Sequence, residues 1–307
     1  MFTLSGRSEE IARVLQEIHP IVVSVVIPAY NAQHYLKECI DSVRKQTIGP
    51  VEIIVVDDGS SDGTKAIVDT YDDDRLRYFY QKNSGVAAAR NLGANKAQGS
   101  YLAFLDADDM LMPSCLQERL NKLSSGGFGL VHNTMQMIDG SSGTLVGLMQ
   151  GKEGHLLDDL LLWEGCCIPT PSSIMVTKTV FESVGGFNIE LSNNADQEFF
   201  FRVANKCIIG KIDKPLAYYR LHPNNMHKNI RLLEKDSLKA YSLASENHLF
   251  KSGKFENKCY SNMYMILAAN FLGSQKLTDW LRGIKYIVLS LYRYPANIKK
   301  IVNKVLR

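Results

Sequence analysis

Short apolar runs alternate with amphipathic stretches between Val22 and Asp109, and this alternation limits the folds open to the chain. Four runs have the length of buried strands, at residues 22–27, 51–56, 75–80 and 101–105. Helices are predicted between them, at 34–46, 61–71 and 84–96, the last with Ser84 as its N-cap. Strands that alternate with helices indicate a doubly wound α/β sheet.

The second half of the sequence is less regular. A glycine-rich bend at 126–129 precedes residues 130–138, and the Gly- and Ser-rich stretch 140–154 predicts an exposed hairpin or a flexible loop. A helix is predicted at 197–204 and a short strand at 217–221, and the pattern is helical from Asn229 onward. With a boundary near Met226, we expect three regions: a helical segment (1–21), an α/β domain (22–226) and a C-terminal helical region (227–307).

The composition is that of an ordinary globular protein, with 45% hydrophobic and 22% charged residues. A net charge of +3 is too small to indicate a nucleic-acid partner. The N-terminus lacks the apolar core of a secretory signal, and no stretch reaches the roughly 20 apolar residues of a membrane span. The six cysteines lack zinc-site spacing and are expected to be reduced, buried thiols. These features predict a cytoplasmic protein, which can still touch a membrane surface.

Three polar clusters stand where predicted strands end, at 28–31, 57–62 and 106–109. In an open α/β sheet, ligands bind beyond the carboxyl ends of the strands. We therefore expect the three clusters to lie along one edge of the sheet.

The cluster Asp106-Ala107-Asp108-Asp109 has the chemistry of a cation site. Carboxylates are preferred ligands of Mg²⁺ and Mn²⁺, and such a metal can bridge the phosphates of a substrate. The alternative is that Asp108 and Asp109 cap a helix that begins near Pro113, which leaves the third carboxylate unexplained.

Asp58 and Tyr30 are candidates for nucleotide recognition. A carboxylate can accept a hydrogen bond from a base or a ribose hydroxyl, and an aromatic ring can stack on a base. Turn and capping chemistry is the alternative at 57–62, and it explains Asp57 and Asp62 equally well. Packing at the sheet edge is the alternative for Tyr30.

Taken together, three segments resemble the family 2 glycosyltransferases of the GT-A fold: VSVVIPAYNAQHYLKECIDSVRKQT, VEIIVVDDGSSDGT and SGVAAARNLGANKAQGSYLAFLDADDMLMP. VGGFNIELSNNADQEFFFRVA resembles the family's acceptor-side motif, and KPLAYYRLHPNNM resembles the strand that closes its site. The resemblance extends from Val23 to about Asn225. It implies a Rossmann-like nucleotide-diphospho-sugar transferase domain at 22–226, with a C-terminal helical extension.

The resemblance also implies roles for single residues on the nucleotide side. Pro28, Ala29 and Tyr30 match positions that line the base pocket. Asp58 matches the acid that binds the base, usually uracil. Arg90 matches an arginine that lies close to the nucleotide.

Asp106, Ala107 and Asp108 match the family's Asp-x-Asp motif. The resemblance implies that Asp106 and Ala107 contact the nucleotide-sugar, and that Asp108 ligates a divalent metal, Mn²⁺ or Mg²⁺. Arg220 and His222 fall where some members contact the diphosphate or the metal. A surface histidine after a strand is the alternative for His222.

Asp196 falls where the family places its catalytic base. The family motif there is usually Glu-Asp, whereas this chain has Ala195-Asp196, so Glu198 is the alternative base. The implied reaction inverts the anomeric carbon: the base takes a proton from an acceptor hydroxyl while a nucleotide diphosphate leaves. A UDP-sugar donor is favoured, with a glycan or lipid-linked acceptor in cell-surface polysaccharide or glycolipid assembly.

The C-terminal segment 276–307 contains eight basic residues and one acidic residue, Asp279. At 298–307 the apolar and basic residues lie on opposite sides of a predicted helix, which can rest on an anionic membrane surface. The aromatic residues Trp280, Tyr286, Tyr292 and Tyr294 suit such an interface. The alternative is a helix docked on the catalytic domain with a solvated basic face.

Three rival classes of protein share parts of this pattern. A receiver-like signalling module also has acidic residues at a strand end, but it is shorter and lacks the second acidic cluster. A sugar nucleotidyltransferase normally carries a Gly-rich, basic loop, which residues 27–33 lack. A catalytically silent glycosyltransferase-like binding protein would keep the nucleotide-sugar site without transfer activity.

Overall fold

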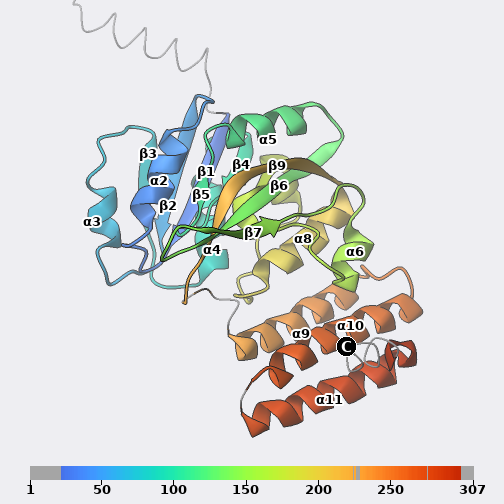
Figure 1. Cartoon of the computed structure of the whole chain (residues 1–307). Coiled ribbons are helices and arrows are strands. Elements are labelled where there is room, and N and C mark those ends of the chain that lie inside the picture. Colours follow the sequence, from blue (N-terminus) through green and yellow to red (C-terminus); the bar gives the residue numbers. More distant parts are fainter. Residues whose placement is uncertain (1–21, 224, 226–228, 275, 299–307) are drawn as a thin grey trace, which may run out of the picture.

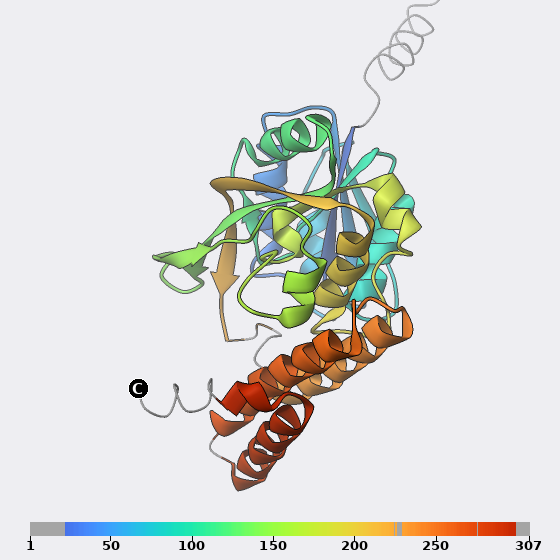
Figure 2. The same ribbon diagram turned by 90° about the vertical axis from the view of Figure 1, so that its right-hand side faces the viewer.

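The computed structural model describes residues 22–223, 225, 229–274 and 276–298. A mixed sheet with helices on both faces forms the main body, and three further helices form a layer below it (Figures 1 and 2). The predicted helical segment 1–21 and the predicted boundary near Met226 lie outside the described residues, and both stay predictions.

The strands of the described chain form one sheet in the order β3-β2-β1-β4-β8-β6-β9-β5, with β7 paired to β6. Strands β1 to β4 are mutually parallel where they pair, and β8 runs antiparallel to both β4 and β6. The predicted parallel sheet is therefore correct for the first half, and the second half is mixed. The strands are β1 (Val23–Ala29), β2 (Val51–Asp57), β3 (Leu76–Tyr80), β4 (Tyr101–Phe104), β5 (Met110–Leu111), β6 (Phe128–Asp139), β7 (Leu145–Met149), β8 (Ile174–Thr177) and β9 (Ile208–Leu221).

Two hydrophobic cores lie on opposite faces of the sheet, because successive side chains of a strand point to opposite sides. Val26 and Ile54 pack into the core shared with α4 and α8, whereas Val25 and Ile53 pack into the core shared with α2 and α5. The helices of the body are α2 (Leu36–Arg44), α3 (Thr64–Val68), α4 (Val86–Lys96), α5 (Cys115–Ser124), α6 (Leu157–Leu162), α7 (Lys178–Ser183) and α8 (Ala195–Lys206).

The three C-terminal helices are α9 (Ile230–Glu246), α10 (Gly253–Leu272) and α11 (Leu277–Arg293). Tyr241 of α9 and Phe271 of α10 belong to the same buried cluster as Phe199 of α8. The Tyr241 hydroxyl donates to the Leu161 carbonyl at 2.6 Å. The expected helical extension is thus joined to the body by a common core.

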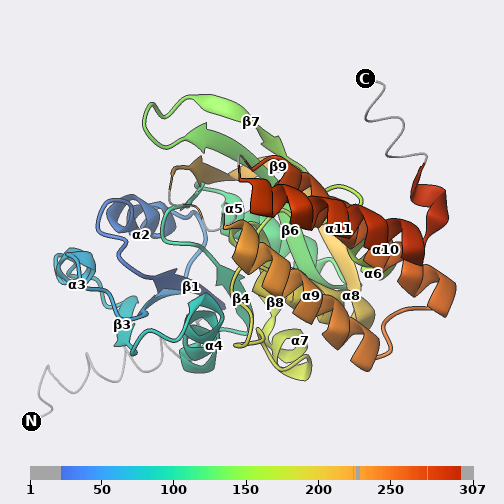
Figure 3. The same cartoon turned by 90° about the horizontal axis from the view of Figure 1, so that it is seen from below.

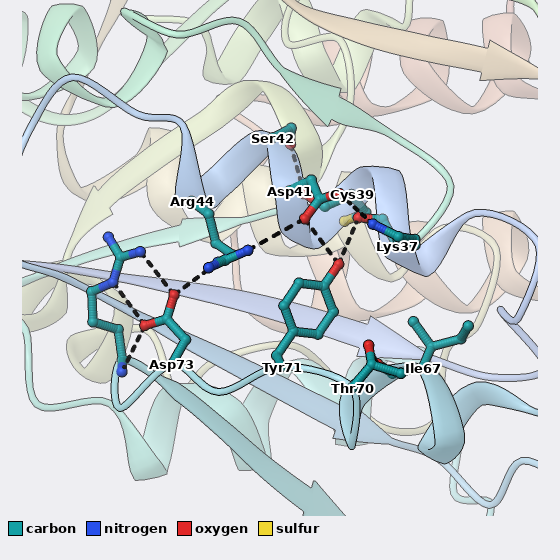
Figure 4. A network of polar contacts seen from close by, with 10 residues as sticks. Lys37, Cys39, Asp41, Ser42, Arg44, Ile67, Thr70, Tyr71 and Asp73 are labelled. Atoms are coloured by element: carbon teal, nitrogen blue, oxygen red, sulfur yellow. Dashed lines mark hydrogen bonds and ion pairs between the residues drawn. The ribbon is translucent and has the colours of Figure 1, made fainter.

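A polar network fixes α2 beside the segment that leads into β3 (Figure 4). The Tyr71 hydroxyl donates to Asp41 Oδ1 at 3.0 Å, and Arg44 Nε lies 2.8 Å from Asp73 Oδ2. The guanidinium groups of Arg75 and Arg44 hold the pKa of Asp73 well below its usual range. This network holds the helix whose first turn contributes to the site described below.

Each element predicted between residues 22 and 109 is present, with its ends shifted by at most three residues. The predicted N-cap at Ser84 is wrong: α4 begins at Val86 after Gly85, whose φ of +92° suits glycine. Residues 140–154 contain the return strand β7 and so form the predicted hairpin. All six cysteines are free, as expected, although Cys166 is exposed.

Candidate active site

The three predicted polar clusters lie along one edge of the sheet. Ala29 of β1 pairs in register with Asp57 of β2, and Val26 of β1 pairs with Phe104 of β4. The residues that follow these strands therefore emerge side by side. Viewed from below, this carboxyl edge lies on the same side of the molecule as the C-terminal helices (Figure 3).

Pro28 and Ala29 are buried within β1, and Tyr30 is the first exposed residue after them. Tyr30 is 55% exposed, which does not favour simple packing at the sheet edge. An exposed aromatic ring at the carboxyl edge is available to stack on a planar ligand.

Asp58 organises the loop that leads into α4. Its Oδ1 accepts hydrogen bonds from Gln81 Nε2 at 2.7 Å and from Ser84 N at 2.8 Å, and its Oδ2 accepts one from Gly85 N at 2.9 Å. A carboxylate has about four acceptor positions, so these bonds leave about one for a ligand. Asp58 therefore has a loop-fixing role, and its contact with a base stays a prediction.

Asp57 and Asp62 stabilise the turn by hydrogen bonds, which is the alternative that the sequence offered to ligand binding. Asp57 accepts hydrogen bonds from the Tyr78 hydroxyl at 2.7 Å and from Ser60 N at 2.8 Å. Asp62 accepts from Thr64 N at 2.9 Å and from Gln33 N at 3.1 Å. Both carboxylates shape the loop between β2 and α3.

Arg90 joins α4 to the Asp-x-Asp segment after β4. Its Nη2 lies 2.6 Å from Asp106 Oδ1, and its guanidinium lies 5.2 Å from the centre of the Phe187 ring. Arg90 is buried, whereas the Asp106 side chain is partly exposed and remains open to a ligand. Ala107, the small residue of the motif, is buried beside it.

His222 contacts Asp108 at the point where β9 reaches the carboxyl edge. Its Nε2 lies 2.8 Å from Asp108 Oδ2, and the His222 side chain is only 10% exposed. The alternative of a solvent-exposed surface histidine therefore does not hold. The structure brings the two predicted metal ligands into direct contact.

Arg220 ties the same strand to the 106–109 cluster. Its backbone N–H donates to Asp109 Oδ1 at 3.1 Å, and its Nε donates to the Asp108 carbonyl at 2.9 Å. The guanidinium also forms an ion pair with Glu38 of α2. Arg220 thus links β9 to the 106–109 cluster and to α2, and it brings a guanidinium group to the site.

Tyr35 contacts both Arg220 of β9 and His222, which follows that strand. Its ring is stacked on that of His222, with centroids 5.2 Å apart, and lies 4.9 Å from the Arg220 guanidinium. Sequence reasoning missed Tyr35 and Glu38 as site residues. The pattern placed Tyr35 on the apolar face of the predicted helix 34–46, and nothing in it distinguished Glu38 from a solvated charge.

Asp109 is 1% exposed and does not cap a helix, because α5 begins at Cys115 with Ser114 at its N-cap position. Its Oδ2 has no hydrogen-bond partner within the described part of the chain. Burial, together with the charges of Asp108 and Asp106, raises the pKa of Asp109 well above its usual range. Burial and Asp106 also raise the pKa of Asp108, an effect that His222 opposes.

Asp196 stands in the first turn of α8 and faces a pocket. The pocket has a volume of about 320 Å³ and is lined by residues that include Leu160, Trp163, Cys167, Pro169, Asp196 and Phe200. Burial raises the pKa of Asp196, while the positive charge of Arg90 lowers it and that of Asp106 raises it. The charges of Arg90 and Asp106 thus influence Asp196, in agreement with the prediction that the base and the Asp-x-Asp motif share one site.

Glu198, the alternative base, forms an ion pair with Arg202. Its two oxygens pair with Arg202 at 2.7 and 2.6 Å, and the side chain is buried away from the pocket. With both oxygens bonded to Arg202, Glu198 is not placed to meet an acceptor hydroxyl in the pocket. The geometry favours Asp196.

A metal ion would find two protein ligands here. Among the residues that the structure describes, no group of three His, Cys, Asp or Glu side chains is arranged to hold a metal. The 2.8 Å between Asp108 Oδ2 and His222 Nε2 is close to the roughly 3 Å that separates neighbouring ligands of an octahedral ion. An oxygen–imidazole pair suits Mn²⁺, and phosphate oxygens and water normally complete such sites. The residues present therefore fit a divalent cation that is held jointly with a phosphorylated ligand.

The sequence profile described as "Glycosyl transferase family 2" matches residues 24–185. A glycosyltransferase of Rickettsia felis, itself uncharacterized, is 34% identical over 208 residues, which are 67% of this chain and 34% of the relative. The chondroitin synthase of Escherichia coli is 30% identical over 241 residues, which are 74% of this chain and 31% of that protein. The chain thus spans about a third of the length of these relatives.

Among solved structures, S. aureus TarS 1-349 in complex with UDP-GlcNAc matches with a TM-score of 0.67 at 18% identity, over 89% of this chain and 81% of that chain. Likeness at this identity shows the fold alone, and it confirms the expected GT-A, Rossmann-like fold with C-terminal helices. The family match also sets aside a receiver-like module and a sugar nucleotidyltransferase. With its polar strand ends gathered into one site and more than half of its length matched by the family profile, the chain belongs to glycosyl transferase family 2.

Proposed function

We propose that this chain is an inverting, metal-dependent glycosyltransferase that moves one sugar from a nucleotide-diphosphate donor, a UDP-sugar by preference, to an acceptor hydroxyl. The observation that carries the proposal is the gathering of the Asp-x-Asp segment, Arg90 and His222 at one edge of the sheet, where Arg90 pairs with Asp106 and His222 contacts Asp108. Asp196 faces a pocket, and the charges of Arg90 and Asp106 both affect its pKa. TarS, which shares the fold, was crystallised with UDP-GlcNAc. That complex supports a uridine donor without identifying the sugar.

Asp196 is the proposed general base. A carboxylate whose pKa is raised by burial accepts a proton from a sugar hydroxyl more readily at neutral pH than an ordinary aspartate does. One such group is sufficient, since the nucleotide diphosphate leaves without being protonated. Glycoside hydrolysis differs, because it needs an acid and a base on either side of the bond.

The proposed donor site lies on the other side of Arg90. Tyr30 would stack on the base, Asp58 and the 28–30 segment would border it, and the Asp106–Ala107 segment would contact ribose or sugar. Arg90 and Arg220 offer positive charge where the leaving diphosphate gains negative charge. Mn²⁺ or Mg²⁺, bound by Asp108 and His222, would supply further charge to the diphosphate oxygens.

The acceptor is proposed to enter the pocket beside Asp196. Trp163 and Phe200 give this pocket aromatic surface next to the carboxylate, and such surface commonly packs against apolar faces of ligands. A glycan or lipid-linked acceptor fits this chemistry, and the name of the E. coli relative, chondroitin synthase, supports a role in polysaccharide assembly. The cytoplasmic location expected from the sequence is part of the same proposal.

The test combines donor binding with turnover. A panel of nucleotide-sugars with Mn²⁺ is first screened by thermal shift, because a bound donor stabilises the folded state. With the donor that binds, Asp196→Asn is expected to lower the rate of transfer by about 10²–10⁴-fold, the usual contribution of a general base, with donor affinity unchanged. Asp159→Asn, which removes a charge that pairs with Lys152 at the surface, is the matched control and should keep the wild-type rate.

Two results would contradict the proposal. An equal loss of donor affinity in Asp196→Asn would reassign the residue to binding or folding. Donor binding by the wild-type protein without transfer or donor hydrolysis would indicate a catalytically silent nucleotide-sugar binding protein.

A further inference from the structure

Helix α11 packs against the protein through a side that combines polar residues with the ring of Tyr286. Its buried residues Asp279, Gly283, Tyr286 and Ser290 follow helical spacing and face α9 and α10. Asp279 pairs with Arg231, and the Tyr286 hydroxyl donates to Glu234 at 2.6 Å. Ser290 Oγ donates to the Ser261 carbonyl at 2.9 Å, and Ser261 Oγ donates to the Ser290 carbonyl at 2.8 Å. These hydrogen bonds, a second ion pair between Arg282 and Glu234, and the Tyr286 ring stacked on Tyr264 and Phe271 together dock the helix.

The opposite side of α11 is apolar and exposed. Six large hydrophobic side chains recur at helical spacing along it, and their exposed fractions run from 44% at Ile284 to 84% at Tyr292. They are Leu277, Trp280, Leu281, Ile284, Val288 and Tyr292. A helix on a globular protein normally buries its apolar side, and a continuous exposed apolar strip marks an interaction surface. We call these six residues the outer strip.

Positive charge borders the outer strip. Lys276 and Lys285 are exposed beside it, and the single acidic residue of 276–298, Asp279, is buried against Arg231. The sequence continues with Lys299, Lys300, Lys304 and Arg307. A second copy of the chain docked symmetrically on the outer strip would bring these like charges together, which opposes self-association through this face.

The position of α11 leaves its outer side accessible to a flat partner. It is the outermost helix of the layer below the sheet (Figures 1 and 2), on the side toward which the carboxyl edge also points (Figure 3). In the described part of the chain, no helix has the length and apolar character needed to cross a bilayer. Trp280 and Tyr292 each combine an apolar ring with a polar atom, as side chains at a membrane–water interface do.

We propose that the outer strip of α11 docks on an anionic lipid surface. The apolar side chains would enter the boundary between head groups and acyl chains, while Lys276 and Lys285 would meet the lipid phosphates. The docking surface is separate from the catalytic site, so the inference stands independently of the proposed transfer reaction.

Vesicle flotation of the full chain tests the proposal without any assay of transfer. The wild-type protein is expected to float with phosphatidylglycerol-containing vesicles and much less with pure phosphatidylcholine. Leu281→Glu combined with Val288→Glu should lower the partition by about tenfold or more, because two inserted aliphatic side chains are replaced by charges. Lys276→Glu with Lys285→Glu should also lower it, and this loss should be smaller in high salt.

The matched control is Leu145→Glu with Val146→Glu, which alters two similarly exposed apolar residues of β7 and should float like the wild type. An equal loss in this control would overturn the assignment to α11. Equal binding to both vesicle types, or no binding to either, would overturn the anionic lipid partner. A dimer formed without lipid and dissociated by the α11 double variant would instead make a second copy the occupant of the strip.

Discussion

At the scale of single residues, each of three neighbouring aspartates in the site has a different kind of partner. Asp106 faces the Arg90 guanidinium, Asp108 faces the His222 imidazole, and Asp109 is buried against the backbone N–H of Arg220. Three ionised carboxylates so close together would repel one another, and the raised pKa of Asp109 relieves part of that repulsion. Two accessible carboxylates then remain for a ligand.

If Asp108 and His222 hold the cation, each substitution Asp108→Asn and His222→Ala should weaken Mn²⁺ binding by about tenfold or more, because each removes one of two protein ligands. Mn²⁺ binding in the presence of UDP can be followed by electron paramagnetic resonance or calorimetry. Asp69→Asn, which removes an exposed carboxylate paired with Lys65, is the control. Unchanged Mn²⁺ affinity in both site variants would contradict the assignment.

The sequence located most of these residues because strand ends and short motifs carry a local signal. Asp58 and Asp106 follow apolar runs, and Asp196 lies in a recognisable segment. The contact of Arg220 with Glu38, however, joins residues 182 positions apart. It depends on how β9 returns to the edge of the sheet, which no local pattern encodes.

At the scale of elements, α9 braces the turn that precedes α8. Asp236 of α9 is buried, and its Oδ2 accepts hydrogen bonds from Ser192 N at 2.8 Å and from Asn193 N at 2.6 Å. Asn194 Nδ2 donates to Ser237 Oγ at 2.7 Å. The helical extension therefore positions the first turn of α8, where Asp196 lies.

Asp236→Ala is expected to lower the free energy of unfolding by about 3 kcal/mol, since it leaves buried backbone N–H groups without an acceptor. A small displacement of Asp196 should also lower kcat by up to about 10²-fold, with little change in donor KM. Urea unfolding and steady-state kinetics measure the two effects. Lys235→Ala, an exposed neighbour on α9, is the control, and a destabilised Asp236→Ala enzyme with wild-type kcat would refute the positioning role.

The elements themselves differed in how far the sequence could predict them. Strands β1 and β2 are buried on both faces, so each is a nearly continuous apolar run, whereas β3 at the sheet edge is only half-buried. Only residues 217–221 of β9 were predicted, because exposed Asp213 and Lys214 interrupt the pattern. The pairing register between β9 and β6 shifts at these residues, beside Pro215. The break in the apolar pattern is therefore an irregularity within one strand and not the end of a strand.

At the scale of the whole molecule, the local sequence pattern could not predict which side of α11 faces the protein. The sequence suggested either a membrane helix at 298–307, which lies outside the described residues, or a docked helix with a solvated basic face. The observed helix buries polar residues, for which Glu234 of α9 and Ser261 of α10 supply partners, beside the Tyr286 ring in the core. An amphipathic pattern shows that two faces differ, whereas tertiary contacts decide which face is buried.

The stability of the whole fold should depend on pH through His132 of β6. This residue is fully buried, its Nε2 donates to the Lys152 carbonyl at 2.7 Å, and its Nδ1 has no partner among the described residues. Burial lowers the pKa of His132 to about 4, whereas the unfolded chain has a value of about 6.5. Between these values the unfolded state binds more protons, so the free energy of unfolding falls as the pH falls.

The expected loss from His132 is about 2–3 kcal/mol between about pH 7 and pH 4.5. Other groups titrate over the same interval, so the comparison is made with His132→Gln, whose amide can still donate to the Lys152 carbonyl but cannot be protonated. Urea unfolding of both proteins across this range should show the wild type losing its advantage over the variant as the pH falls. If the two stability curves stayed parallel, His132 would be protonated equally in the folded and unfolded states, and its burial would not limit the acid stability of the sheet.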